Sequence, residues 1–400
     1  MNLESDSTGD AQAGSHGGCH YIEGLLAVRP RDIDIAVESL GMEGLDSGDV
    51  TDDVLGEYLG DAQVQDERGE PPIRVLSVPE NPHRTAARLV HRKDPIPASP
   101  IHGVGYESHG KYMSGEGPHR VKTELGAPPK GELAGWIAVV DSGLVEEESR
   151  PEWMRQPFVR DLSPDPENVR GEGASHGTFV TSLIRMAAPE YGVAFAAAPP
   201  DLVGKLSTET PGEVADPPTT ELDVLGAISR LVAALGSEPS TVKALNLSLG
   251  AAQCGANDSF LLTLRSAIDL WRSHFGQNAP IFAAGGNSDN PYPVFPAALD
   301  CVRGVGAGVD EEVTQRVWDD NGDPVAARHR FWIDDVAPGL GLHGAGGLAE
   351  SDVVEWSGSS FASAVATALN VKSAAFVVHD GIVYWQDRPV SYDRVVGLHH

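Results

Sequence analysis

Between Trp136 and Phe376 the sequence alternates short apolar runs with longer segments of helical spacing, and this alternation strongly constrains the fold. The short runs are typical of strands buried on both faces, whereas the longer segments repeat apolar residues every three or four positions. Strands are expected at 136–140, 242–249, 280–284 and 302–308, and helices at 176–186, 222–235, 260–275 and 360–376. Because strands that alternate with helices form right-handed crossovers, we predict an α/β fold with a doubly wound, mainly parallel sheet.

The chain is predicted to have four parts. Residues 1–19 are rich in Gly, Ser, Asp and Ala and have too little apolar surface to offset the entropy of ordering, so a disordered tail is expected. A small α/β domain is predicted for residues 20–106. Residues 107–130 are rich in Gly, Pro, Ser and Lys, so an exposed linker is predicted there. The large domain covers 131–400. In the small domain, strands are expected at 21–28, 73–78 and 101–106, and helices at 31–40 and 82–93.

Charge and cysteine content disfavour several classes of protein. The chain has 58 acidic and 29 basic residues and a formal net charge of −29, which argues against nucleic acid or an anionic membrane surface as partner. Its three cysteines, Cys19, Cys254 and Cys301, form no disulfide framework and indicate a reducing compartment. Since no stretch approaches the roughly 18 apolar residues of a membrane span and no secretion signal is recognisable at the start, a soluble, cytoplasmic protein is expected.

Four polar residues stand where chemistry is expected, because ligands of a parallel sheet bind beyond the carboxyl ends of its strands. Asp141 and Asn287 each follow a predicted strand, and His176 and Ser360 each open a predicted helix. Taken singly, each has an ordinary structural alternative: Asp and Ser cap helices, His fills cores, and Asn occupies turns. Taken together, they offer a nucleophile, a base and an amide N–H₂ that can donate to an oxyanion.

In this order along an α/β chain, the segments resemble the signature blocks of the subtilisin-like serine proteases, whose chain order is Asp, His, Ser. The matching blocks are Val-Val-Asp-Ser-Gly at 139–143, His-Gly-Thr at 176–178, Asn287, and Gly-Ser-Ser-Phe-Ala at 358–362. Residues 246–250 are similar to the family's substrate-pairing strand, and 335–339 to its Ala-Pro-Gly turn. The resemblance covers residues 135 to about 376.

The resemblance implies a serine endopeptidase. Ser360 is then the nucleophile, and His176 takes its proton and later gives it to the leaving amine. Asp141 orients the imidazole and stabilises its charged form. Asn287 and the backbone N–H of Ser360 bind the tetrahedral oxyanion.

The resemblance also implies how a polypeptide substrate is held and how the enzyme is controlled. Ser248, Leu249 and Gly250 bind an extended substrate by strand addition. The N-terminal domain, by its order and placement alone, resembles the ferredoxin-like propeptide that inhibits many subtilases. This implies an autoinhibited zymogen cleaved between Tyr106 and Lys130, with a permanent regulatory or docking domain as the alternative.

Some features depart from the family pattern. Phe179 stands where many members have a second His, and Ala364 where a Pro commonly follows the nucleophile; loss of this Pro would loosen the helix and change how water and amines compete for the acyl enzyme. The alternatives are therefore a ligase-like acyl-transfer enzyme and a slow or inactive peptide-binding protein. No carboxylate cluster can be assigned to calcium, which is only a family expectation, so no cofactor and no metal ligand is predicted.

Overall fold

The computed structural model describes two compact units. One unit contains Met1–Val104, Pro200–Ser229 and Cys254–Leu270, and the other contains Gly105–Pro199, Arg230–Gln253 and Trp271–His400. The described residues are 13–16, 19–52, 71–104, 118–122, 124–128, 131–164, 172–198, 219–252, 261–287, 293–308, 316–318, 324–326, 332–346, 352–372, 376–379 and 382–385. The domain boundaries at 20–106, 107–130 and 131–400 stay a prediction.

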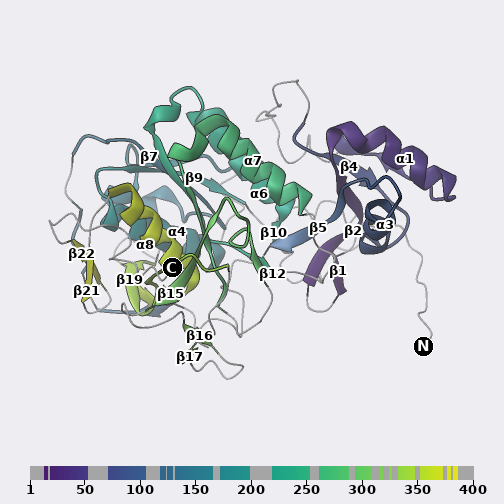
Figure 1. Ribbon diagram of the computed structural model, residues 1–400. Coiled ribbons are helices and arrows are strands. Elements are labelled where there is room, and N and C mark those ends of the chain that lie inside the picture. Colours follow the sequence, from purple (N-terminus) through teal and green to yellow (C-terminus); the bar gives the residue numbers. More distant parts are fainter. Residues whose placement is uncertain are drawn as a thin grey trace. The chain divides into compact units, whose positions relative to one another are not determined.

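A seven-stranded sheet forms the centre of the larger unit (Figure 1). Its order is β18-β15-β13-β11-β7-β9-β8, and every neighbouring pair is parallel, as the alternating sequence pattern predicts. The strands are β7 (Trp136–Asp141), β8 (Val159–Asp161), β9 (Gly192–Ala197), β11 (Val242–Leu247), β13 (Ile281–Ala284), β15 (Arg303–Gly308) and β18 (Asp335–Pro338). All residues of β7, β9 and β13 are buried, so both faces of the sheet's centre are covered.

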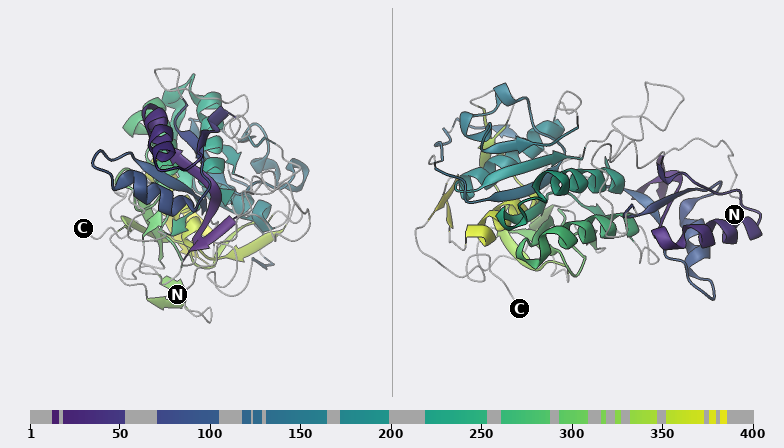
Figure 2. Two further views of the ribbon diagram at one scale, coloured as in Figure 1. Left: turned by 90° about the vertical axis from the view of Figure 1, so that its right-hand side faces the viewer. Right: turned by 90° about the horizontal axis from the view of Figure 1, so that it is seen from above.

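Long helices lie between the parallel strands in the sequence, and the last of these helices follows the final strand of the sheet. They are α4 (Glu172–Ala187), α6 (Glu221–Leu235), α7 (Leu262–Phe275) and α8 (Ser359–Lys372). Helices α4 and α8 lie side by side and pack on the same face of the sheet, α4 over β7 and β9 and α8 over β11, β13, β15 and β18 (Figures 1 and 2). None of the helices among the described residues is long and apolar enough to span a membrane.

Shorter strands surround this core. Strands β12 (Ala251–Ala252) and β14 (Val294–Phe295) pair antiparallel, and β6 (His119–Arg120), β19 (Leu342–Ala345) and β20 (Val353–Trp356) form a three-stranded sheet. Two further hairpins are β16 (Arg316–Trp318) with β17 (Pro324–Ala326), and β21 (Phe376–His379) with β22 (Ile382–Trp385). Single 3₁₀ turns span Pro30–Asp32, Glu147–Ser149, Glu152–Met154, Pro239–Thr241 and Gly276–Asn278.

The N-terminal residues of the other unit form a sheet with two helices. The strands are β1 (Ala13–His16), β2 (Cys19–Val28), β3 (Gly48–Asp49), β4 (Arg74–Ser77) and β5 (Ala98–Val104), with β10 (Thr219–Thr220) at the edge beside β5. The helices are α1 (Ile33–Met42) and α3 (Pro82–Val90). The order β5-β2-β4-β3, with one helix after the first strand and one after the third, is the β-α-β-β-α-β arrangement of ferredoxin-like folds.

Local sequence signals account for parts of this small fold. The Asn81 side chain accepts a hydrogen bond from the backbone N–H of Arg84 at 3.3 Å. Asn81 is therefore the N-cap of α3, and Pro82 is the first residue of the helix. The apolar faces of α1 and α3 pack on one face of the sheet, where Leu40 and Leu89 are fully buried. These two helices therefore close the small core.

Four local predictions are corrected by the structure. Helix α4 begins at Glu172, so His176 lies about one turn inside it and not at its start. Helix α8 ends at Lys372, and Phe376 begins β21. Residues 335–338, expected in a turn, form the edge strand β18, and Ala13–His16, within the expected disordered tail, pair with β2. For residues 335–338 and Ala13–His16, pairing with another strand overrides a weak local signal.

A close contact between α4 and the end of β7 fixes how the helix sits on the sheet. A methyl group on Gly177 would overlap the carbonyl oxygen of Gly143 and lie 2.9 Å from the ring of Phe195. Gly143 itself has a φ of 154°, which residues with a side chain rarely adopt. The absence of a side chain at Gly177 therefore allows α4 to approach the backbone carbonyl of residue 143, and glycine at 143 allows the backbone conformation there.

We expect Gly177→Ala to lower the free energy of unfolding by about 1–3 kcal/mol, because the added methyl group forces α4 away from β7. Gly41→Ala is the matched control: Gly41 is also helical, in α1, and a methyl group there meets no atom within 4 Å. That change should be neutral or stabilise by up to about 1 kcal/mol. Urea denaturation followed by circular dichroism measures both, and equal effects would refute the close contact.

Candidate active site

The carboxylate of Asp141 lies at the end of β7, where the fold places ligands. Its Oδ1 accepts hydrogen bonds from the backbone N–H of Ser142 at 2.7 Å and from the Ser142 hydroxyl at 2.9 Å. The same oxygen lies 2.8 Å from Nδ1 of His176, and both side chains are fully buried. Three donors around one oxygen hold the carboxylate in a single orientation.

The imidazole of His176 is held between Asp141 and a set of aromatic rings. Its centroid lies 5.5 Å from the Trp356 ring in an edge-to-face arrangement and 5.2 Å from the Phe361 ring. Phe179, at the position of the family's second His, is fully buried and packs on both of these rings, with centroid distances of 5.6 and 4.6 Å. The apolar side chain of Phe179 therefore belongs to the packing that encloses the imidazole.

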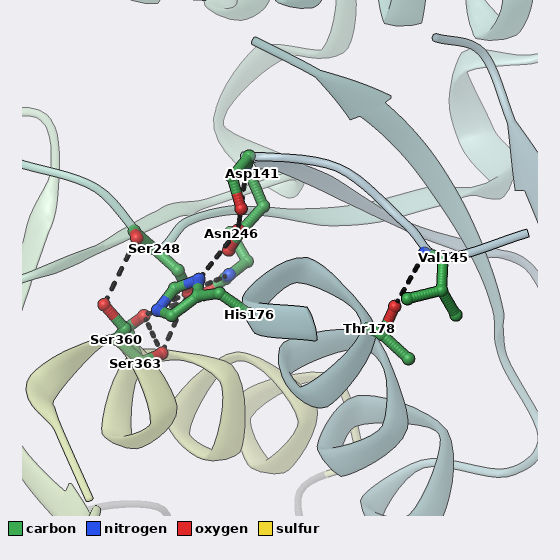
Figure 3. A network of polar contacts seen from close by, with 9 residues as sticks. Asp141, Val145, His176, Thr178, Asn246, Ser248, Ser360 and Ser363 are labelled. Carbon is green, nitrogen blue, oxygen red and sulfur yellow. Dashed lines mark hydrogen bonds and ion pairs between the residues drawn. The ribbon is translucent and has the colours of Figure 1, made fainter. Parts of the chain in front are cut away.

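The hydroxyl of Ser360 lies in the first turn of α8. It donates to the backbone carbonyl of Ser248 at 3.2 Å, and the Ser248 hydroxyl donates back to the carbonyl of Ser360 at 2.9 Å. Figure 3 shows these two serines facing each other, with the His176 ring between Asp141 and Ser360. For a proton to pass from Ser360 to His176, the hydroxyl must turn from the Ser248 carbonyl toward the ring.

A buried polar network ties β11 to α8 beneath Ser360 (Figure 3). Asn246 donates from Nδ2 to the Ser248 hydroxyl at 2.7 Å, and its Oδ1 accepts from the hydroxyls of Ser363 at 3.0 Å and Thr367 at 3.2 Å. Asn246, Ser363 and Thr367 were not predicted as site residues. Their spacing on α8, four residues apart, is the one sequence signal that places Ser363 and Thr367 on the same face of the helix.

Asn287 follows β13 and lies next to the start of α8. Its Oδ1 accepts a hydrogen bond from the backbone N–H of Ser359 at 2.7 Å, and the Ser359 hydroxyl accepts from the N–H of Gly286 at 3.2 Å. Because a backbone N–H donates only to the oxygen of a side-chain amide, this contact assigns Oδ1 and Nδ2 of Asn287. The N–H₂ end is directed away from Ser359 N and is the end that can donate to an oxyanion.

The structure thus brings the predicted residues together in pairs. Asp141 contacts His176, Ser360 contacts Ser248, and Asn287 contacts the residue before Ser360. The predicted substrate-binding residues Ser248, Leu249 and Gly250 continue the chain beyond the end of β11, and Leu249 is fully buried. Within the described parts of the chain, no group of three or more His, Cys, Asp or Glu side chains could hold a metal ion.

Comparison with known proteins shows the family to which the chain belongs. The model of the subtilase family matches residues 134–376, so the chain belongs to the subtilase family. No curated protein matches the chain.

Solved structures of several proteases are similar to this chain. The protease domain of PatA has 22% identity and a TM-score of 0.43, over 60% of this chain and 78% of its own. A lanthipeptide protease has 15% identity and a TM-score of 0.42, over 60% and 74%. The epidermin leader peptide processing serine protease EpiP of Staphylococcus aureus has 13% identity and a TM-score of 0.47, over 87% and 88%.

We expect Asn246→Ala to lower the free energy of unfolding by about 1–3 kcal/mol, because it removes a buried amide of β11 that bonds to Ser248 and to two hydroxyls of α8. The change should also weaken the orientation of Ser360, since Ser248 loses one partner. Asn278→Ala, at an exposed position in the larger unit, is the control and should change stability by less than about 0.5 kcal/mol. Chemical denaturation of both variants tests this, and equal stability would contradict a structural role for the network.

Proposed function

We propose that this subtilase is a serine endopeptidase that hydrolyses peptide bonds through Asp141, His176 and Ser360. The observation that carries the proposal is the buried 2.8 Å contact between Asp141 Oδ1 and His176 Nδ1, on a ring that faces the first turn of α8. In this arrangement Nδ1 carries the proton that faces the carboxylate, so Nε2 is the nitrogen that can accept a proton. The triad then acts as in other serine hydrolases.

The proposed reaction proceeds in two halves. Ser360 Oγ attacks the substrate carbonyl while His176 takes its proton, and Asp141 stabilises the imidazolium that forms. The tetrahedral oxyanion accepts hydrogen bonds from Asn287 Nδ2 and the backbone N–H of Ser360. His176 then protonates the leaving amine, and water releases the acyl group by the reverse sequence.

We also propose that the N-terminal domain inhibits the enzyme until it is cleaved. Its ferredoxin-like strand order and its place before the protease region support this role. A cytoplasmic location is proposed from the small number of cysteines, and Cys301 is a free thiol.

We expect Ser360→Ala to abolish both peptide hydrolysis and labelling by a fluorophosphonate, because both need the hydroxyl, while the free energy of unfolding changes little. Ser273→Ala, at an exposed serine of the same unit, is the matched control and should keep full labelling. Labelling of wild type without hydrolysis of any peptide would favour the acyl-transfer or slow peptide-binding alternative. Absence of labelling in wild type, including protein nicked by limited proteolysis, would overturn the proposal.

Asn287→Ala is expected to lower kcat by about 10²–10³-fold, the usual effect of removing one oxyanion donor, while KM changes little. The variant also loses the bond from Ser359 N, so fluorophosphonate labelling provides the check that Ser360 is still reactive. A higher KM with unchanged kcat would exclude Asn287 as an oxyanion donor.

Autoinhibition is tested by mass spectrometry of the purified chain. Wild type should be cleaved between residues 106 and 130, and Ser360→Ala should stay intact, because cleavage needs the enzyme's own nucleophile. Cleavage of both proteins at the same bond would show that another protease does it, and an intact but active wild type would favour a permanent regulatory domain.

A further inference from the structure

Trp356 is buried beside the imidazole of His176, and no polar contact accounts for a tryptophan at this position. It is the last residue of β20, lies opposite Leu342 of β19 and is 4% exposed. Its Nε1 is buried and has no hydrogen-bond partner among the residues that the structure describes. A buried N–H without a partner costs free energy, and a phenylalanine or leucine would avoid this cost. The indole ring is therefore expected to have a role beyond filling the core.

The two rings meet at nearly a right angle. The centroids of the Trp356 and His176 rings are 5.5 Å apart, and the ring planes make an angle of 87°. In such an arrangement one ring directs its edge at the face of the other. Nδ1 of His176 faces Asp141, and under the proposed function Nε2 receives the proton of Ser360. The carbon-bound hydrogens are therefore the part of the imidazole edge that can face the indole.

The other neighbours of this ring pair are also aromatic. The Phe361 ring lies 5.2 Å from the His176 ring at a tilt of 41°, and the rings of Phe361 and Phe179 pack on Trp356 at 5.1 and 5.6 Å. Both phenylalanines and His176 are fully buried. A charge on the imidazole is therefore screened by water much less than a charge at the protein surface.

The proposed reaction places a positive charge on His176. When Ser360 Oγ bonds to the substrate carbonyl carbon, its O–H bond breaks, an N–H bond forms at Nε2, and the imidazole becomes an imidazolium. A cation within about 6 Å of a ring centroid is attracted to the negative face of the ring, and tryptophan is the strongest such partner. The attraction arises only once the proton has moved, so it accelerates the chemical step and leaves substrate binding unchanged.

We propose that Trp356 is a positioning residue that acts through His176, an inference that rests on the proposed function. Its indole face receives the edge of the imidazole and stabilises the imidazolium that forms when Ser360 attacks. Asp141 holds the same ring by Nδ1. The charged ring is thus stabilised by a carboxylate at one nitrogen and by an aromatic face along its carbon edge.

The test uses the full chain and a fluorophosphonate, whose reaction with Ser360 needs the same proton transfer to His176. Tryptophans with increasing numbers of ring fluorines, placed only at position 356 by nonsense suppression, keep nearly the same size but carry less negative charge on the ring face. The labelling rate constant at saturating probe should fall with each added fluorine. The probe concentration that gives half of this rate should change by less than about twofold.

Conventional variants give the size of the effect. Trp356→Leu should lower the labelling rate constant by about ten- to thirtyfold, because it removes the aromatic face from a desolvated cation. Trp356→Phe should lower it by only about threefold, since phenylalanine is a weaker partner for a cation. If Trp356→Leu fails to fold, the fluorinated series still decides the question, because fluorine hardly alters the packing.

Trp271 is the matched control. It is fully buried in α7, its ring packs on Phe275 at 4.3 Å, and its Nε1 donates to the carbonyl of Ala279 at 3.0 Å. The same fluorinated series at position 271 should leave the labelling rate unchanged. A rate that does not depend on fluorination at 356, or that falls equally at 271, overturns this inference and leaves the protease assignment in place. If wild type is not labelled at all, the proposed function fails and this inference fails with it.

Discussion

The contact between Gly177 and Gly143 is the constraint on which the site depends. It lets α4 approach the end of β7 so closely that Nδ1 of His176 lies 2.8 Å from Oδ1 of Asp141. A wider separation of helix and strand would leave a buried carboxylate and a buried imidazole without each other, which is costly in a protein interior. The sheet determines at which edge the residues meet, and the two glycines determine how closely they meet.

Helix α8 is attached to the sheet in a different way. All of its residues from Ser359 to Leu369 are buried, and among them Ser363 and Thr367 direct their hydroxyls to Asn246 on β11. Each such bond contributes only about 0.5–1.5 kcal/mol net, but a buried polar group without a partner costs more than that. The network therefore disfavours sliding or rotation of α8, since any shift by one residue breaks several bonds together. Apolar packing alone would hold the helix less specifically, and Ser360 with it.

Much of this arrangement could be predicted from the sequence, and the exceptions have physical causes. Strands rich in β-branched residues, such as β7, and helices with a clear apolar face, such as α6, were predicted within a residue or two. The strand β9, Gly-Val-Ala-Phe-Ala-Ala, was missed because its alanines favour helices as much as strands, and only burial between β7 and β8 makes it a strand. Glycines before His176 suggested a loop, whereas α4 runs through that segment.

Some residues of the candidate site can be recognised from the local sequence, and others can be found only from contacts in the folded structure. Asp141, His176, Asn287 and Ser360 stand in short blocks that are recognisable by themselves, whereas the partners that orient them come from elsewhere in the chain. Asn246 is the clearest case: 117 residues separate it from Ser363 in the sequence, and only the packing of α8 on β11 brings them together. Strands β11 and β13 are paired up to Leu247 and Ala283, and the chain beyond each of them carries one polar residue of the site, Ser248 or Asn287. The positions of Ser248 and Asn287 therefore depend on the register of β11 against β13, because a shift of one residue would turn the side chains of a strand to the opposite face.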